Sequence, residues 1–177
     1  EHCDGVACAV RERAMSTLDK LRTLAQVAEE RERWRAEGRT VALANGIFDL
    51  LHVGHVRYLQ GARALADVLV VAVNSDASTR AYKGPGRPYI PESERAELVA
   101  ALACTDRVIL FDEPNVRGII RALKPDVHVK GTDYTPDTIP EAGEVRAYGG
   151  RTAVAGDPKD HSTTEIALRT GRESGKG

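Results

Sequence analysis

Two histidines three residues apart, His52 and His55, are the side chains of this sequence best placed to do chemistry. They follow a short apolar run at 41–44 and open a helical pattern at 54–66, so we expect them in the first turn of a helix that directly follows a strand. This spacing puts both imidazoles on one side of the turn, and Gly54 between them lets a ligand approach the backbone. Unpaired N–H groups and the positive end of the helix dipole lie at the same place. The arrangement predicts an anion site, with phosphate as the favoured anion.

Two other interpretations of the histidine pair stay open. The pair is also compatible with a strand–helix junction that binds nothing. Imidazoles can ligate zinc as well, but Asp49 is the only nearby carboxylate, and no cysteine or acidic cluster adds ligands at a recognisable spacing. The zinc interpretation is therefore disfavoured, and no residue is assigned to a metal.

The elements that must position these histidines alternate along the chain. Short apolar runs predict buried strands, and amphipathic stretches between them predict helices. The predicted strands lie at 41–44, 68–73, 107–111, 126–129 and 152–155, and the predicted helices near 54–66, 92–103, 115–123, 138–148 and 162–170. This alternation is typical of an α/β fold with a Rossmann-like, doubly wound, five-stranded parallel sheet and helices on both faces. Ligands are then expected beyond the carboxyl ends of the strands.

The rest of the chain is expected to flank this domain. We expect a disordered lead at 1–15, one N-terminal helix at 16–38 that packs on the domain, the domain itself at 39–170, and a flexible tail at 171–177. Ser16 is the predicted cap of the leading helix and Gly38 its end. Neither a Gly-x-Gly-x-x-Gly nor a Gly-x-x-x-x-Gly-Lys-Ser/Thr motif occurs, which disfavours dinucleotide binding and P-loop hydrolysis.

Three further polar patches follow predicted strands. Residues 74–76 lead into a stretch at 80–88 with one lysine (Lys83) and two arginines, which we interpret as a mobile basic loop suited to polyphosphate, or else as an ordinary solvated loop. The patch at 130–134 offers Lys130 for a phosphate and the next residues for a base, although a plain surface loop is the alternative. At 161–166, Ser162 and Glu165 form a capping box at the start of the last helix, where hydroxyls and free N–H groups also bind phosphate.

Charge and cysteine content limit the partners. The 177 residues carry 25 basic and 26 acidic side chains, a formal net charge of −1, so no broad field favours nucleic acid or an anionic membrane surface. No apolar run approaches the roughly 18 residues of a membrane span. The three scattered cysteines, Cys3, Cys8 and Cys104, are typical of free thiols in a reducing cytoplasm. We therefore expect a cytoplasmic protein that binds small molecules.

The stretch from Asn45 to His55, Asn-Gly-Ile-Phe-Asp-Leu-Leu-His-Val-Gly-His, resembles the signature of the cytidylyltransferase-like nucleotidyltransferases. With the stretches at 69–76, 83–88, 129–138 and 161–164, the likeness extends from about Asp19 to Arg169. It is closest to the D-glycero-β-D-manno-heptose 1-phosphate adenylyltransferases. The resemblance implies transfer of AMP from ATP to a sugar 1-phosphate, a requirement for Mg²⁺, and a homodimer. Since no sugar-kinase half is recognisable, we expect a monofunctional transferase.

The resemblance also assigns roles. His52, His55 and Lys83 are the expected catalytic residues, acting on the phosphates. Asp49 is expected to orient a histidine or a magnesium-bound water. The other expected nucleotide-binding positions are Asn45, Gly46, Ile47, Phe48, Asp49, Gly54, Arg95, Lys130, Gly131, Asp133, Tyr134, His161, Ser162, Thr163 and Thr164. For Arg95, a surface ion pair is the alternative.

Two departures from the family pattern leave the substrate open. Ile47 stands where relatives usually carry Cys or Thr, and the loop at 156–160 is more charged than expected. A CTP-dependent cytidylyltransferase acting on glycerol 3-phosphate shares the first and last motifs. A non-catalytic nucleotide-binding domain is the second alternative.

Overall fold

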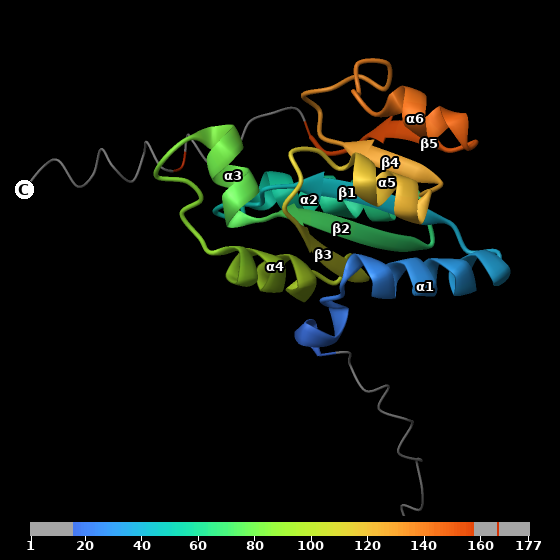
Figure 1. Ribbon diagram of the computed structural model, residues 1–177, viewed down its shortest axis with the longest axis horizontal. Coiled ribbons are helices and arrows are strands. Elements are labelled where there is room, and N and C mark those ends of the chain that lie inside the picture. The colour runs from blue at the N-terminus through green and yellow to red at the C-terminus, as the bar shows by residue number, and fades with distance from the viewer. Residues whose placement is uncertain (1–15, 158–165, 167–177) are drawn as a thin grey trace, which may run out of the picture.

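The computed structural model describes residues 16–157 and Ile166. Five strands form one parallel sheet in the order β3-β2-β1-β4-β5 (Figure 1). They are β1 (Val41–Gly46), β2 (Val68–Asn74), β3 (Arg107–Phe111), β4 (Val127–Lys130) and β5 (Arg151–Val154). Each overlaps a predicted apolar run, so the expected five-stranded parallel sheet is confirmed.

The helices between the strands cover both faces of the sheet. They are α1 (Leu24–Ala36), α2 (Val53–Arg63), α3 (Asp76–Lys83), α4 (Glu92–Ala101), α5 (Arg117–Leu123) and α6 (Ala142–Ala147), preceded by a 3-10 turn, η1 (Thr17–Lys20). Those predicted near 54–66, 92–103 and 115–123 are confirmed. The helix predicted at 138–148 is shorter, because 135–138 forms a separate turn in which Thr138 N–H donates to the Thr135 carbonyl at 3.0 Å.

Alternate strand residues face two separate apolar clusters, as a strand's period of two requires. One cluster joins Ala42, Ala44 and their counterparts on β2 and β4 to Leu59 and Ala62 of α2 and Val99 of α4. The other joins Val41 and Leu43 to α1, α5 and Val145 of α6. The sheet is therefore buried on both sides, with α2 and α4 on one face and α1, α5 and α6 on the other.

The order of the strands places a cleft at the carboxyl end of β1. β1 pairs with β2 on one side and with β4 on the other, so the connections leaving β1 and β3 diverge there. Ligands of open α/β sheets bind at such a point. In Figure 1, α3 lies beyond the carboxyl ends of β1 and β2.

The expectation of one continuous helix at 16–38 is wrong. Ser16 does cap a helical turn, its N–H donating to Asp19 Oδ2 at 3.1 Å, but that turn is the short η1. Leu21 is extended and forms a β-bridge with Val108 of β3. Thr23 then caps α1, because its side chain accepts from the Gln26 N–H at 3.2 Å. Pairing with the edge of the sheet thus overrides the helical period of the sequence.

The basic stretch at 80–88 is also not simply a loop. Its first part is the end of α3, which begins because Ser75 Oγ accepts from Ser78 N–H at 3.1 Å. Lys83 is the last residue of this helix, and Gly84, with φ of 90°, ends it in a conformation that favours glycine. Lys83 is therefore carried by a helix rather than by a free loop.

Two smaller expectations also meet the structure. Cys104 is a free thiol, and burial raises its pKa. Cys3 and Cys8 lie outside the described residues. Among residues 16–157, no helix has the length and apolar character needed to cross a bilayer.

Candidate active site

A cavity of about 530 Å³ lies at the carboxyl ends of the strands. Segments far apart in the sequence meet here: the turn after β1, the start of α2, α3, and the loops after β3, β4 and β5. The cavity gathers most of the site residues expected from the sequence. These are Asn45, Gly46, Ile47, Phe48, Asp49, His52, Gly54, His55, Lys83, Lys130, Gly131, Asp133 and Tyr134.

The two histidines lie face to face at the start of α2. Their ring centroids are 3.9 Å apart with an interplanar angle of 28°. Phe48 packs its ring edge on His55, with centroids 5.4 Å apart at 60°. The expected helix start is confirmed, since His52 is the N-cap and its carbonyl accepts from His55 N–H at 2.9 Å.

His55 is held as a neutral hydrogen-bond donor. Burial, followed by the neighbouring His52, lowers the pKa of His55 from 6.5 to about 4, while Asp49 acts in the opposite direction. The backbone N–H of His52 lies 3.4 Å from His55 Nδ1, which must then accept. A neutral imidazole that accepts at Nδ1 carries its proton on Nε2. His55 can therefore offer an N–H to a phosphate oxygen without being protonated.

The turn between β1 and α2 is strained. Phe48 and Leu50 have φ of 54° and 48°, which is uncommon for residues with side chains. The Phe48 ring folds back over Gly46, where an added Cβ would lie 3.2 Å from ring carbons. A conformation that costs of order 1–3 kcal/mol per residue persists only where the surroundings enforce it, and such places cluster at functional sites.

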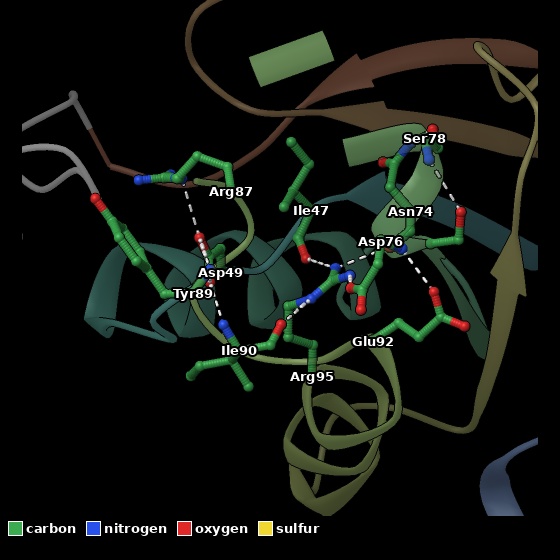
Figure 2. A network of polar contacts seen from close by, with 11 residues as sticks. Ile47, Asp49, Asn74, Asp76, Ser78, Arg87, Tyr89, Ile90, Glu92 and Arg95 are labelled. Carbon is green, nitrogen blue, oxygen red and sulfur yellow. Dashed lines mark hydrogen bonds and ion pairs between the residues drawn. The ribbon is translucent and has the colours of Figure 1, made fainter. Parts of the chain in front are cut away.

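Asp49 is one of the groups that enforce this turn (Figure 2). It is only 2% exposed, and its carboxylate accepts from the N–H groups of Tyr89 and Ile90 at 3.0–3.1 Å. Arg87 Nε lies 3.2 Å from the same carboxylate. In this structure Asp49 therefore holds the segment before α4 against the site, a role that the sequence did not indicate.

Arg95 lies beneath the turn and is not a surface residue. It is fully buried, and it does not line the cavity. Its guanidinium donates to the carbonyls of Ile47 at 2.5 Å, Asn74 at 2.8 Å and Ile90 at 2.9 Å, and pairs with Asp76 at 2.7 Å (Figure 2). The alternative of a surface ion pair is wrong, because the guanidinium that pairs with Asp76 is fully buried. The expected contact of Arg95 with nucleotide stays a prediction.

The opposite wall of the cavity comes from β4 and the loop after it. Burial lowers the pKa of Lys130, and the carboxylate of Glu141 acts against that shift. Lys130 Nζ lies 5.7 Å from the ring centroid of Tyr134. Two residues earlier in β4, Nε2 of the fully buried His128 is 3.2 Å from Asn45 Oδ1. Because that contact occupies the amide oxygen, the Asn45 NH₂ group is left to donate elsewhere.

Several lining residues were missed by reasoning from the sequence. On the α2 side, Arg57 forms an ion pair with Asp157, whose carbonyl accepts from the Thr132 hydroxyl at 2.8 Å. Elsewhere the structure adds Tyr58, Ser78, Tyr82, Arg87, Asn115 and Glu141. Tyr82 and Arg87 stood in the basic stretch already marked at 80–88, Thr132 in the patch at 130–134, and Asp157 in the charged loop at 156–160. The others approach through tertiary packing and carry no local signal.

The last expected motif cannot be placed. His161, Ser162, Thr163 and Thr164 lie outside the described residues, and so does the capping box of Ser162 and Glu165. Ile166 is helical, in line with the helix predicted at 162–170. Among residues 16–157 and 166, no group of three or more His, Cys, Asp or Glu side chains is arranged to hold a metal ion.

Comparison with known proteins identifies the family. The family model described as cytidylyltransferase-like matches residues 43–169. The chain belongs to the cytidylyltransferase-like family. Within it, the chain is 47% identical over 161 residues to the "Bifunctional protein HldE" of Syntrophotalea carbinolica, covering 91% of this chain and 33% of that protein. The HldE of Acidiphilium cryptum is 46% identical over 156 residues, covering 88% and 32%. This cytidylyltransferase-like chain thus spans about a third of the length of these relatives.

Solved structures agree with this membership. A lipopolysaccharide core biosynthesis protein from Thermoplasma volcanium is 31% identical with a TM-score of 0.56, covering 66% of this chain and 94% of its own. A pantoate-beta-alanine ligase from Francisella tularensis shares the fold, with a TM-score of 0.53 at 11% identity, covering 85% and 76%. The Rossmann-like architecture and the expected family are both confirmed for the cytidylyltransferase-like chain.

Proposed function

We propose that this chain transfers AMP from ATP to a sugar 1-phosphate, with heptose 1-phosphate as the favoured acceptor, and releases pyrophosphate. The observation that carries the proposal is the stacking of His55 on His52, both of which line the cavity, with His55 Nδ1 accepting from the His52 N–H. Membership in the cytidylyltransferase-like family supports nucleotidyl transfer. The similarity to proteins named HldE, together with the motifs that resemble heptose 1-phosphate adenylyltransferases, supports the acceptor.

The reaction needs positioning and charge stabilisation more than a strong base. A phosphate oxygen of the sugar 1-phosphate, already ionised at neutral pH, attacks the α-phosphorus of ATP in line. The bond from the α-phosphorus to the bridging oxygen breaks, and pyrophosphate leaves with that electron pair. Preorganised donors aimed at the developing charge lower this barrier. His52 and His55 would donate to the α-phosphate and to the departing oxygen.

The basic side chains of the cavity would hold the remaining charge. Lys83 lies at the end of α3, with its Nζ 5.1 Å from the ring centroid of Tyr82, and borders the cavity. From there it would neutralise charge on the phosphates. Asp133 and Tyr134 would border the base and ribose, and Lys130 would bind a phosphate. Ser162 and Thr163 stay the predicted contacts of the β- and γ-phosphates.

Magnesium stays a prediction of the resemblance. The carboxylate of Asp49 is already bound by two backbone N–H groups and Arg87, so it does not fit the expected role of orienting a metal-bound water. The described residues provide no other metal cluster. Mg²⁺ would accordingly arrive on the phosphate oxygens of the nucleotide, as it commonly does. A homodimer likewise stays a prediction.

A pyrophosphate-release assay tests the proposal. The purified chain is assayed with ATP, CTP, GTP and UTP against heptose 1-phosphate, mannose 1-phosphate and glycerol 3-phosphate. We expect release with ATP and heptose 1-phosphate, and an ADP-sugar as product. Release only with CTP and glycerol 3-phosphate would favour the cytidylyltransferase alternative. Nucleotide binding by calorimetry without release would favour the non-catalytic one.

A further inference from the structure

The residues that line the cavity come from both faces of the sheet, so we distinguish two regions of it. The histidines, Phe48 and Tyr58 lie on the α2 side, where Phe48 and Tyr58 belong to the apolar cluster of α2 and α4. Asn45 is the last residue but one of β1, and Asn74 is the last residue of β2. They follow Leu43 and Ala72 at the strand period of two, and those two residues face α1 and α5. The side chains of Asn45 and Asn74 therefore open on the other region.

This second region is polar and lies toward α5 and α6. Asn115 and Val116, just before α5, line it together with Glu141, just before α6. Lys130 borders the same region, since it follows His128 at the strand period of two and His128 contacts Asn45. Three side-chain amides, one carboxylate and one ammonium group border this region. Neither His52 nor His55 lies on this side of the sheet.

Glu141 is the group in this region that the fold itself does not explain. The residue is only 5% exposed, and its Oε2 is buried without a hydrogen-bond partner within the described chain. Although Glu141 is the N-cap of α6, its side chain makes no capping bond. Among the described residues, Glu141 forms no ion pair with Lys130 or any other side chain. Its negative charge nevertheless raises the pKa of Lys130 against the larger effect of burial. Burying a carboxylate oxygen without a hydrogen-bond partner costs folding free energy, so the position of Oε2 needs an explanation.

The chemistry of a carboxylate narrows the ligand class. A carboxylate repels phosphate and accepts hydrogen bonds, so it suits a donor group of the ligand. A metal ion is a poor fit, because no described cluster supplies further ligands. One end of each neighbouring amide is already engaged: Asn45 Oδ1 with His128, Asn74 Nδ2 with Ser78, and Asn115 Oδ1 with the Arg117 N–H. The opposite ends, two NH₂ groups and one oxygen, suit the hydroxyls of a sugar. Since the α2 side carries the histidines and aromatic rings, the region of Glu141 is left for the acceptor.

We propose that Glu141 binds the acceptor by accepting hydrogen bonds from hydroxyl groups of its sugar ring, with Asn45, Asn74 and Asn115 around the same ring. This inference rests on the proposed function and names the residue that selects a polyhydroxylated acceptor. The sugar's own phosphate then extends toward the cleft between Lys130 and the histidines. Glu141 is a specificity residue that touches substrate, and it takes no part in bond making.

Steady-state kinetics of Glu141→Gln and Glu141→Ala test the assignment, with ATP and heptose 1-phosphate as the probes. A hydrogen bond to a charged group is worth about a tenfold to hundredfold change in affinity. We expect the KM for heptose 1-phosphate to rise about tenfold for Gln and about 100-fold for Ala. The KM for ATP should stay unchanged. Glu144→Gln is the matched control, since Glu144 lies on the same helix, pairs with Arg121 and does not line the cavity.

A second measurement begins with the unaltered chain, so that its first result does not depend on how a variant folds. Monodeoxy analogues of heptose 1-phosphate are assayed with the unaltered chain and with Glu141→Gln. The analogue lacking the recognised hydroxyl should lose its affinity for the unaltered chain and show little further loss with the variant. Equal acceptor KM values for the unaltered chain and both variants, with no analogue affected, would overturn the role of Glu141 and leave the proposed function standing. No pyrophosphate release by the unaltered chain with any sugar phosphate would instead refute the proposed function, and this inference with it.

Discussion

At the scale of single residues, the protonation state of His55 decides what it can do. With a pKa of about 4 and an acceptor contact at Nδ1, the ring is neutral at physiological pH and donates from Nε2. A cation fixed in a dry pocket would hold substrate and product phosphates tightly as well. A neutral donor binds ground states less strongly, and its hydrogen bond strengthens as charge builds on the leaving oxygen.

Replacing His55 should therefore affect turnover more than binding. We expect His55→Ala to lower kcat about 10²–10³-fold, the usual scale for one preorganised donor, with a smaller change in the KM for ATP. His55→Asn, which keeps an N–H donor, should retain more activity than the alanine variant. Pyrophosphate release, with circular dichroism to check folding, measures both. A folded His55→Ala protein with undiminished kcat would contradict the role given to this ring.

At the scale of elements, the site depends on the segment before α4, which the sequence pattern predicts only as a connection. Residues 87–90 are fixed on two sides: Asp49 accepts from the Tyr89 and Ile90 N–H groups, and Arg95 of α4 donates to the Ile90 carbonyl. Arg95 also reaches the Ile47 carbonyl in the turn of the histidine motif. One buried guanidinium, that of Arg95, thus joins helix α4 to the turn of the histidine motif.

Removing that guanidinium should loosen the turn and destabilise the fold. Breaking a buried, hydrogen-bonded charge pair typically costs about 3–5 kcal/mol. We expect Arg95→Met to lower the free energy of unfolding by about this amount, and Arg95→Lys by less, because lysine keeps the charge for Asp76 but not the forked donors. Urea denaturation provides the measurement.

Arg121→Met is the control for the Arg95 variants. Arg121 makes an exposed pair with Glu144, and such pairs contribute about 0–1 kcal/mol. Similar losses of stability for Arg95→Met and Arg121→Met would show that the buried network does not hold the turn.

The elements also show where the local sequence pattern predicts secondary structure correctly and where it does not. The five strands were predictable because each overlaps a short apolar run. β1, β2 and β4 are almost fully buried, whereas β5 is exposed or half-buried along its length. The break in the helix predicted at 16–38 was not predictable. It arises because Leu21 is extended and forms a β-bridge with Val108, which lies 87 positions later in the chain. Helix α3 was hidden by its polar composition, and its start depends on a serine cap that is weak evidence by itself.

At the scale of the whole molecule, the buried His128 and the half-buried His55 make stability depend on pH. Burial, then Lys130, lowers the pKa of His128 from 6.5 to about 3, and His55 falls to about 4. Above pH 6.5 both rings are neutral whether the chain is folded or not. As the pH falls below 6.5, the unfolded chain takes up protons that the folded chain excludes, so stability is lost until the pH nears the folded pKa values.

Replacing His128 should reduce this pH dependence. Each such group contributes a slope of up to about 1.4 kcal/mol per pH unit. Between pH 6 and pH 4.5 we expect His128→Leu to lose stability more slowly than the unaltered chain, by about that amount per unit. Near pH 7.5 the change should be small, because leucine also removes a buried Nδ1 that has no partner in the described chain. Urea denaturation at several pH values tests this, and identical slopes would contradict it.

The sequence by itself determined the sheet, its parallel sense and the histidine motif, because those depend on periodicity and spacing within some ten residues. The same short-range information placed Lys130 and Asp133 at a strand end, and the cavity indeed includes them. Only the tertiary structure decided that Asp49 and Arg95 support the turn from below, and that Glu141 faces the cavity from another loop. These roles arise from contacts between residues 40 or more positions apart in the chain, such as Asp49 with Tyr89 and Ile47 with Arg95, and no local pattern encodes such a contact.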